Sequence, residues 1–484
     1  MLVLDDLHWA DQPSLLLLQF VARELSGARL LLIGTYRDVE LSRQHPLAEA
    51  LGELNRERLF QRVLLRGLTQ EDVEHFIEMT SGNSAPRGLV EAVHSQTEGN
   101  PLFVTEVVRL LVQEGELSAE KARETDSWTI RIPEGVREVI GRRLNRLSQR
   151  CNDTLVIASV IGREFTLGQL TPLAEDMSED RLLEVLEEAL AARVIEELPQ
   201  TVGRYQFTHA LIQETLAEEL STTRRVRLHA RIAEALEELY GADAEAHAAE
   251  LAHHFAQAAT ATGQEKLVHY SLLAGERALS GLASEEALAH FERGLVSRGI
   301  TLTGSQPAPD EAAAALLFGL GRARLATVER HRLPEAMACL RRAFDYYAGV
   351  GEVGRVVAIA QHPLPIAPGL LAGVAQLVHQ ALELVQRDSH DEGRILSQYA
   401  GAVYFEENDF EAARDAYSRA LVIAHREKDT ELELRTLSNA ATIDFFHCNF
   451  HECLEKSLRG LELAHGVDDP RAKIGVQIWS PLFD

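Results

Sequence analysis

The chain has 484 residues, 46% of them hydrophobic and 25% charged, so it is long enough for three or four globular domains. Its formal net charge of −26 argues against a broad nucleic-acid surface, because a polyanion repels nucleic acid unless basic side chains are segregated, and no basic patch is large enough. Only four cysteines, no apolar stretch long enough to cross a bilayer and no signal-peptide pattern lead us to expect a cytoplasmic protein without disulfides or a membrane contact.

Residues 1–66 alternate strand and helix patterns. Leu2–Asp5 is expected to form a short buried strand, and Ser14–Leu25 has helical spacing, with Ser14 placed to cap the helix after Pro13. Leu30–Thr35 is a second apolar run, of the kind that parallel sheets bury on both faces. Two strands joined by a helix form one β–α–β unit, which is too little sheet to be stable alone.

Two carboxylates, Asp5 and Asp6, follow the first strand directly. The carboxyl ends of parallel strands open into the crevice where ligands bind, so a carboxylate pair at this place fits a Walker B magnesium site. In that interpretation Asp5 orients Mg²⁺ through a water molecule and Asp6 polarises the attacking water. An Asp-Asp pair also begins many turns, so the alternative is a turn without a ligand.

Helical patterns dominate the next part of the chain. Thr69–Asp72 begins a helix with a polar cap, and the break at Thr97–Val104 (TEGNPLFV) leads into another, so residues 67–130 are expected to form a helical domain. Residues 131–222 contain several short helices, and Pro199–Gly203 separates two strand-like segments as in a hairpin. Helices followed by such a wing predict a winged helix.

From residue 223 the pattern is almost entirely helical, with one break at Gly299–Asp310 (GITLTGSQPAPD) that is typical of a linker. Residues 223–300 are expected to form a helical linker and a first repeat, and residues 311–484 the remaining repeats. A small residue followed by an apolar one recurs with spacings of 49, 38, 39 and 40 residues, at Gly294-Leu295, Ala343-Phe344, Ala381-Leu382, Ala420-Leu421 and Gly460-Leu461.

The clearest repeat is residues 401–424, GAVYFEENDFEAARDAYSRALVIA. Small residues at Gly401, Ala413 and Ala420 allow two antiparallel helices to approach closely, while Tyr404 and Tyr417 can fill the gaps between pairs. The unit resembles a tetratricopeptide repeat, stretched beyond the usual length of about 34 residues. Such pairs stack into an α-solenoid with a concave binding face. The alternative is a plain helical bundle.

Four segments in order, LVLDDLHWAD, LLLIGTYRDVE, TEGNPLFVTEV and RYQFTHALIQETL, resemble the STAND-type signalling ATPases, a branch of the AAA+ class. The closest resemblance is to the bacterial group that includes large LuxR-type regulators and cyclase-linked ATPases. It covers residues 1–300, and the helical repeats are that family's usual sensor half. It implies a mainly α fold: a partial α/β P-loop domain at 1–66, a helical lid at 67–130, a winged helix at 131–222 and then the solenoid.

The resemblance also implies roles for individual residues. His8–Asp11 matches the His-Trp-Ala-Asp that follows the Walker B strand, and Arg37 matches the sensor 1 position near the γ-phosphate. Asn100 and Pro101 match the lid motif whose proline packs on adenine. His209 is similar to the winged-helix histidine that contacts the β-phosphate of ADP. The cofactors implied are ATP or ADP with Mg²⁺, the latter held through water by Asp5.

Each of these residues also has a structural interpretation without a ligand. His8-Trp9 can pack the first helix against the sheet, and Arg37 can be a surface residue after a strand. Asn100-Pro101 can simply end one helix and begin the next, since proline suits the first helical position. His209, beside an apolar strand, can be a structural histidine.

A P-loop is missing from the sequence. That motif, G-x-x-x-x-G-K-[ST], cradles the phosphates with backbone amides and a lysine. None of the five lysines, Lys121, Lys266, Lys428, Lys456 and Lys473, follows a glycine. The sequence therefore resembles the downstream part of a longer protein, and we expect this chain alone neither to bind nor to hydrolyse ATP appreciably.

Two functional hypotheses follow. In the first, the chain belongs to a regulatory switch: ADP holds a closed form, and a protein or small-molecule inducer on the repeats favours an open form that takes ATP and self-associates. Its output, transcription regulation or cyclic-nucleotide signalling, stays open. In the second, the repeats are a protein-interaction scaffold and the front is vestigial. Direct nucleic-acid binding through the winged helix is disfavoured by the acidic charge.

Overall fold

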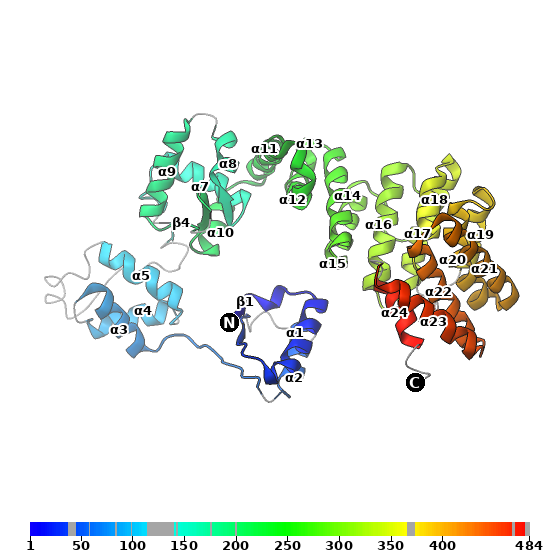
Figure 1. The fold of residues 1–484 in the computed structure, drawn as a ribbon. Helices are drawn as coiled ribbons and strands as arrows, with labels where there is room; N and C mark the ends of the chain where they lie inside the picture. The colour runs from blue at the N-terminus through cyan, green and yellow to red at the C-terminus, as the bar shows by residue number, and fades with distance from the viewer. Residues whose placement is uncertain are drawn as a thin grey trace. The chain divides into compact units, whose positions relative to one another are not determined.

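The computed structural model is mainly helical, with two small sheets among its described residues. It describes residues 1–36, 45–57, 59–82, 85–97, 99–113, 140–141, 144–174, 177–198, 201–364, 373–466 and 470–479. The chain divides into two compact units, Met1–Glu164 with Met177–Glu219, and Phe165–Asp176 with Leu220–Asp484 (Figure 1). Within the described ranges, each helix is too short or too polar to cross a bilayer.

The chain begins with the predicted β–α–β unit. β1 (Leu2–Leu4) and β2 (Leu32–Gly34) pair in parallel, with Val3 opposite Ile33. Between them lie η1 (Leu7–Trp9), α1 (Gln12–Glu24) and η2 (Leu25–Gly27), and α2 (Pro46–Leu54) follows β2. The core of this segment is made by leucines of α1 and α2, which pack under one side of the strand pair.

The prediction that Ser14 caps the first helix is wrong. Asp11 is the N-cap, and its carboxylate accepts the Ser14 N–H at 2.9 Å. Both residue types cap helices well, but Pro13 lacks an N–H and has a fixed φ that suits the first turn. The helix therefore begins before Pro13 rather than after it.

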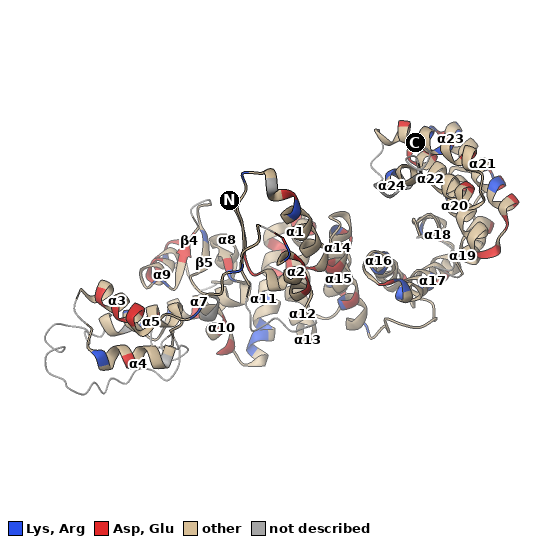
Figure 2. Cartoon of the chain, turned by 90° about the horizontal axis from the view of Figure 1, so that it is seen from below, with Lys and Arg blue, Asp and Glu red and all other residues tan. Residues whose placement is uncertain are grey.

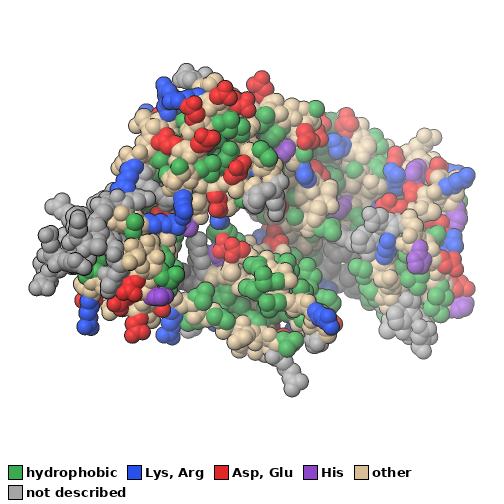
Figure 3. All heavy atoms as spheres, turned by 60° about the vertical axis from the view of Figure 1, so that its left-hand side comes forward, with side chains coloured by type: hydrophobic (Ala, Val, Ile, Leu, Met, Phe, Trp, Pro, Cys, Tyr) green, Lys and Arg blue, Asp and Glu red, His purple; other side chains and the backbone are tan. Residues whose placement is uncertain are grey.

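The two strands are also less buried than predicted. Leu2, Val3 and Ile33 are each more than a third exposed, and only the side with Leu4 and Leu32 packs on the core of α1 and α2. Apolar exposure continues on the outer side of α1, and hydrophobic side chains gather over this segment in the lower middle of Figure 3. Two strands with helices on one side cannot bury both faces of a parallel pair.

Three helices form the next core. α3 (Gln70–Ser81), α4 (Arg87–Thr97) and α5 (Pro101–Gln113) bury a cluster of valines, leucines and Ile77. The predicted polar cap of α3 is present: the Thr69 side chain accepts the Asp72 N–H, and the Asp72 carboxylate accepts the Thr69 N–H. This reciprocal pair satisfies two amides that the first turn would otherwise leave without partners.

The following region combines short helices with a small three-stranded sheet. Its elements are α7 (Gln149–Ile161), β3 (Glu164–Thr166), α8 (Leu167–Leu170), η5 (Thr171–Leu173), α9 (Glu179–Ala191), β4 (Ile195–Glu197), β5 (Arg204–Phe207) and α10 (Ala210–Glu218). The predicted hairpin is present, since β4 and β5 pair antiparallel with Ile195 opposite Phe207. β5 is the central strand of the sheet, in the order β3-β5-β4.

The long segment of the second unit, from Leu220 onward, is a series of helices. They are α11 (Thr222–Tyr240), η6 (Gly241–His247), α12 (Ala248–Gln257), α13 (Ala259–Thr262), α14 (Glu265–Ser280), α15 (Ser284–Ser297), α16 (Glu311–Thr327), η7 (Arg330–Arg332), α17 (Leu333–Val350), α18 (Val353–Ala360), α19 (Val374–Leu384), α20 (His390–Ala402), η8 (Val403–Glu407), α21 (Phe410–Glu427), α22 (Thr430–Phe446), α23 (Phe450–Ala464) and α24 (Pro470–Trp479).

From α14 on, these helices form pairs that stack in chain order. The second helix of each pair contacts its partner and the first helix of the following pair, which is the arrangement of a solenoid and not of a single bundle. In Figure 2, the first helices α16, α18, α20 and α22 lie on the inner side of the curve, and α17, α19, α21 and α23 lie on the outer side.

The recurring small residues lie where the repeat hypothesis places them. Gly294, Ala343, Ala381, Ala420 and Gly460 each lie on the second helix of a pair, and all five are buried. A Cβ atom on Gly460 would come within 2.5 Å of Val476 in α24, and one on Gly294 within 2.9 Å of Leu316 in α16. The small residues therefore set how closely one pair approaches the next.

The predicted linker at 299–310 is held against the helices. Two arginines, Arg324 and Arg342, are 4 to 5% exposed and donate hydrogen bonds to its backbone carbonyls. Arg342 Nη1 lies 2.7 Å from the carbonyl oxygen of Thr301 and its Nε lies 2.7 Å from that of Gln306. The linker is thus part of the packed structure.

Candidate functional site

Asp5 and Asp6 lie at the carboxyl end of β1, beside the end of β2. The Thr35 hydroxyl donates a hydrogen bond to the Asp5 carboxylate, and the Asp6 N–H donates to Thr35 Oγ1 at 3.0 Å. Backbone bonds hold the edge together, from Thr35 N–H to the Leu4 carbonyl at 2.9 Å and from Leu7 N–H to the Thr35 carbonyl at 2.8 Å. Carboxylate and hydroxyl oxygens, which are ligands suited to Mg²⁺, therefore meet at one edge of a parallel strand pair.

The backbone turns sharply at Asp6. Its φ of 54° and ψ of 45° lie in the left-handed region, which aspartate adopts more readily than most residues other than glycine. The turn brings Leu7 over the end of β2, where a Cβ on Gly34 would lie 2.4 Å from Leu7 Cδ1. Asp6 is thus presented at the strand edge by a local fold that depends on its neighbours.

The two residues after this turn differ in environment. His8 is buried, and its Nδ1 lies 3.8 Å from Asp6 Oδ1. Trp9 is 71% exposed, so it does not pack α1 against the strands. The structural interpretation of the His8-Trp9 pair therefore fits His8 alone.

The remaining predicted residues of the front half lie elsewhere. Arg37 is outside the described residues. Asn100 is the residue before α5, and Pro101 is its first residue; both are exposed, and Asn100 Oδ1 accepts the Leu102 N–H at 3.1 Å. Gly99 fixes the approach to this turn, because its φ is 71° and a Cβ there would lie 2.2 Å from the Leu68 carbonyl oxygen. Both the capping and the adenine-binding roles are compatible with this placement.

His209 lies immediately before α10 and makes no capping bond with its side chain. It lines a cavity of about 490 Å³ together with other cationic and anionic groups. The residues around this cavity are Arg109, Leu190, Arg193, Ile195, Glu196, Glu197, Thr208 and His209. Asp5, Asp6, Asn100 and Pro101 are not among them, so this cavity brings His209 together with none of the other described candidates.

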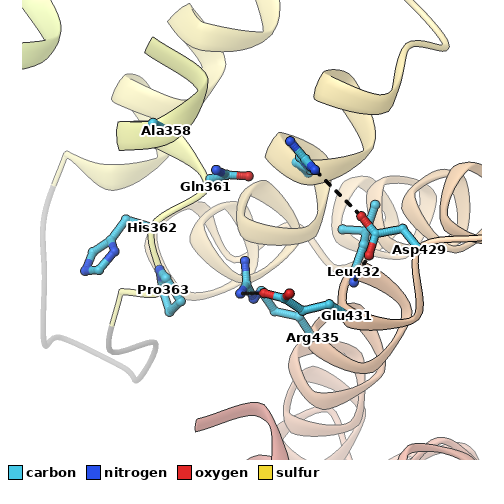
Figure 4. Close-up of a pocket in the computed structure, with 9 residues that line it drawn as sticks. Ala358, Gln361, His362, Pro363, Asp429, Glu431, Leu432 and Arg435 are labelled. Carbon is cyan, nitrogen blue, oxygen red and sulfur yellow. Dashed lines mark hydrogen bonds and ion pairs between the residues drawn. The ribbon is translucent and has the colours of Figure 1, made fainter. Parts of the chain in front are cut away.

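A further cavity, which sequence reasoning missed, lies among the repeats (Figure 4). We call it the inner pocket, because its walls come from the inner helices α18, α20 and α22. It has a volume of about 280 Å³, and it is lined by Ala358, Gln361, His362, Pro363, Arg394, Asp429, Glu431, Leu432 and Arg435.

The carboxylates of the inner pocket are engaged with the protein. Asp429 accepts the Leu432 N–H at 2.9 Å and lies 2.8 Å from His390 Nε2. Burial raises the pKa of Asp429, but these hydrogen bonds and the nearby positive charge outweigh burial, and the pKa is lowered overall. Arg435 donates to Glu431 at 2.7 Å, one helical turn away. Asp429 is thus an ionised group with its partners in place.

The residues of the inner pocket come from three successive repeats, which is why no local motif indicated them. The available sequence signal was the repeat period itself. Arg394 and Arg435 lie 41 positions apart on α20 and α22, close to the spacings of the small residues. A search for polar residues at equivalent positions of the first helices could have found them.

Comparisons with known proteins do not establish a family. No family model matches the chain. An uncharacterized protein of Rhizobium meliloti is 26% identical over 323 residues, which is 65% of this chain but only 29% of the relative. Among solved structures, a signal transduction ATPase with numerous domains and a tetratricopeptide repeat sensor, from Pyrococcus horikoshii, covers 99% of this chain at 13% identity; the match spans 69% of that protein. Its TM-score of 0.34 is too low to support a conclusion.

Proposed function

We propose that this chain is the responding and sensing part of a STAND-type signalling switch. In this proposal a nucleotide governs the conformation of the front half, and an inducer or partner is sensed by the helical repeats. The observation that carries the proposal is the meeting of Asp5, Asp6 and Thr35 at the carboxyl edge of two parallel strands.

The residues present fit part of a magnesium–nucleotide site. The oxygens of Asp5, Asp6 and Thr35 are suitable donors for Mg²⁺, whose charge would stabilise negative phosphate oxygens. The sequence has no glycine-rich loop with a following lysine to cradle phosphates, so the fit is incomplete. We therefore assign nucleotide binding to a longer polypeptide that also supplies a P-loop, and expect no appreciable binding by this chain alone.

Within such a polypeptide, each candidate has a distinct role. Asp5 would hold a water molecule in the magnesium shell, and Asp6 would orient the attacking water. Arg37 would face the γ-phosphate, and Pro101, positioned by Asn100, would pack on the adenine. These roles come from the motif resemblance, and the exposure of Asn100 and Pro101 is compatible with them.

His209 would contact the β-phosphate of ADP in the resting form. Arg109 and Arg193 line the same cavity, and their positive charges favour an anion there, whereas Glu196 and Glu197 oppose one. A phosphate is therefore favoured only close to the arginines and the histidine. The output of the switch, which could be transcription regulation or cyclic-nucleotide signalling, would belong to other parts of the longer polypeptide, as would self-association.

The test removes the two carboxylates from a P-loop-bearing polypeptide that includes this sequence. The Asp5→Asn/Asp6→Asn variant should lose nucleotide hydrolysis by at least a hundredfold while its thermal midpoint changes little, because both groups lie at a solvent-accessible edge. The matched control is Glu53→Gln/Glu57→Gln, which removes two carboxylates that pair with Arg23 in the same segment. Equal activity of the two variants would rule out the Walker B assignment.

The second candidate function is a scaffold that acts through its repeats alone. The stacked helical pairs and the inner pocket favour it, since neither depends on a nucleotide. A scaffold would keep its signalling output in the Asp5→Asn/Asp6→Asn variant, whereas a switch would lose it.

A further inference from the structure

The inner pocket contains two side chains, those of Arg394 and Gln361, that make no hydrogen bond to a described residue. Arg394 has its nearest carboxylates, Asp391 and Asp429, at 3.9 Å, and its guanidinium makes no hydrogen bond to any residue that the structure describes. The Gln361 side-chain amide likewise has no hydrogen-bond partner within the described part of the chain, and Figure 4 shows it extending between α18 and the other walls. Together these groups offer several N–H donors and one carbonyl acceptor to the cavity.

The hydrogen-bonding groups of the cavity, and not its formal charges, favour an anion over a cation, since Arg394 and Arg435 line it together with two carboxylates. The carboxylate of Asp429 is already bonded to an amide and a histidine, and Glu431 is bonded to Arg435. A cationic ligand would have to displace one of these partners. An anionic ligand would instead replace two 3.9 Å contacts of Arg394 with direct hydrogen bonds, since a guanidinium binds a planar carboxylate with two parallel N–H donors.

The size of the inner pocket limits the ligand. A volume of about 280 Å³ is at the lower end of the range for small-molecule sites, which is about 300–1,000 Å³, so a metabolite fits and a folded partner does not. The lining is rich in polar groups and includes only a few apolar side chains such as Leu432 and Ala358. A small, highly polar molecule matches both properties.

We propose that the inner pocket binds a small organic acid. Arg394 binds a carboxylate of the acid with two N–H groups, and Gln361 hydrogen-bonds a second polar group of the same molecule. Because the walls belong to α18, α20 and α22, the bound acid bridges three successive repeats and stabilises one curvature of the solenoid. Its use as the inducer rests on the proposed switch function, but the binding itself does not.

The test is calorimetric titration of the purified chain, at low ionic strength, with succinate, 2-oxoglutarate and citrate. At least one acid should bind, and Arg394→Gln should weaken its binding by about tenfold or more, the loss expected for hydrogen bonds to a charged group. Gln361→Ala should weaken binding by a smaller factor. Arg414→Gln is the matched control: Arg414 is also partly exposed and paired with a carboxylate, Glu411, but it lies on α21 outside the pocket. Its binding should equal that of the wild-type chain.

Three results would overturn the proposal: no acid binding at millimolar concentration, binding that Arg394→Gln leaves unchanged, or Arg394-dependent binding of an acidic peptide when none of the free acids binds. Arg394 is 39% exposed and makes no hydrogen bond to described residues, so its variant should fold, and circular dichroism checks this. The Asp5→Asn/Asp6→Asn variant of the same chain should bind the acid normally. The result therefore stands independently of the nucleotide experiment.

Discussion

Two buried histidines link α11 to α12 and make a local source of acid sensitivity. His229 Nδ1 lies 2.9 Å from His254 Nδ1, and the side chains are 7% and 1% exposed. Burial, with the neighbouring charges of His253 and Arg225, lowers the pKa of His229 to about 4, and burial with the two neighbouring histidines lowers that of His254 to about 3. The folded state therefore keeps both rings neutral in mildly acidic solution.

This pair predicts a specific dependence of stability on pH. The ordinary pKa of a histidine is 6.5. Below that pH the two histidines become protonated in the unfolded chain, whereas in the folded chain they stay neutral down to about pH 4. Stability should be insensitive to the pair above pH 7 and should fall as the pH drops from 6.5 towards 4. Urea unfolding of His229→Leu/His254→Leu should show a pH slope smaller by up to about 1.4 kcal/mol per unit for each histidine.

The control for this measurement is His331→Leu, because His331 is 72% exposed. It should reproduce the slope of the wild-type chain. If the double variant also keeps that slope, the buried pair does not titrate as described.

At the scale of residues, local patterns predicted the position of a residue where that position depends on its neighbours in the chain. The pattern of a strand followed by Asp5 and Asp6 requires only adjacent residues, and at the end of this strand the Asp5 carboxylate and the Asp6 N–H both bond to Thr35. Their role at a magnesium site stays a prediction. The choice between Asp11 and Ser14 as the helix cap depended on how Pro13 would fit the first turn, and the sequence pattern alone favoured the wrong one. The His229–His254 contact joins two helices and left no local signal.

At the scale of elements, buried arginines hold the linker between α15 and α16 in place. Arg342 donates to the carbonyls of Thr301 and Gln306 from a position that is 4% exposed. Composition predicted a linker here but could not predict its packing, because the arginines that hold it are 22 to 41 residues away in the sequence. Long-range partners of this kind are outside the reach of local patterns.

Arg342→Met should therefore destabilise the chain. Two carbonyls would lose a charged donor in a partly buried place, which should cost about 1–3 kcal/mol. Its neighbour Arg341 is the matched control, since it is 34% exposed and pairs with Asp345 across one helical turn, so Arg341→Met should cost under about 1 kcal/mol. Urea unfolding measures both, and equal losses would contradict the role given to Arg342.

Close packing between repeats depends on glycines that face an aromatic ring. A Cβ on Gly319 of α16 would lie 2.3 Å from the Phe291 ring, and one on Gly275 of α14 would lie 2.5 Å from the same ring. Phe291, which is fully buried, is thus held between two helices that can approach only because both positions lack a side chain. This contact belongs to the same class as the small residues that the repeat pattern predicted.

Gly319→Ala should destabilise the solenoid by about 1–3 kcal/mol through overpacking, although alanine alone favours a helix by roughly 1 kcal/mol. Gly349→Ala, on α17, has nothing within 4 Å of the added methyl group and should leave stability unchanged or raise it slightly. Thermal unfolding compares the two. A stabilised Gly319→Ala variant would show that Phe291 moves aside at no cost.

For the whole molecule, the sequence predicted the structure of the helical repeats better than that of the β–α–β unit. The solenoid was predictable because the same local pattern, a small residue on the second helix of a pair, recurs from Gly294 to Gly460. The degree of burial of β1 and β2 could not be predicted from the sequence, since it depends on which further elements cover Leu2 and Val3. The inner pocket was missed for the same reason, as three repeats must stack before Gln361 and Arg394 face one cavity.

The proposed switch requires that the carboxylates at the end of β1 be coupled to the helical repeats. Hydrogen exchange of α18 to α23 in a P-loop-bearing polypeptide that includes this sequence, compared with ADP and with ATP, tests it most directly. We predict that exchange in these helices differs between the two nucleotides, and that Asp5→Asn/Asp6→Asn abolishes the difference. Identical exchange with ADP and ATP in the unmodified polypeptide would contradict the claim and leave the repeats as a binding scaffold alone.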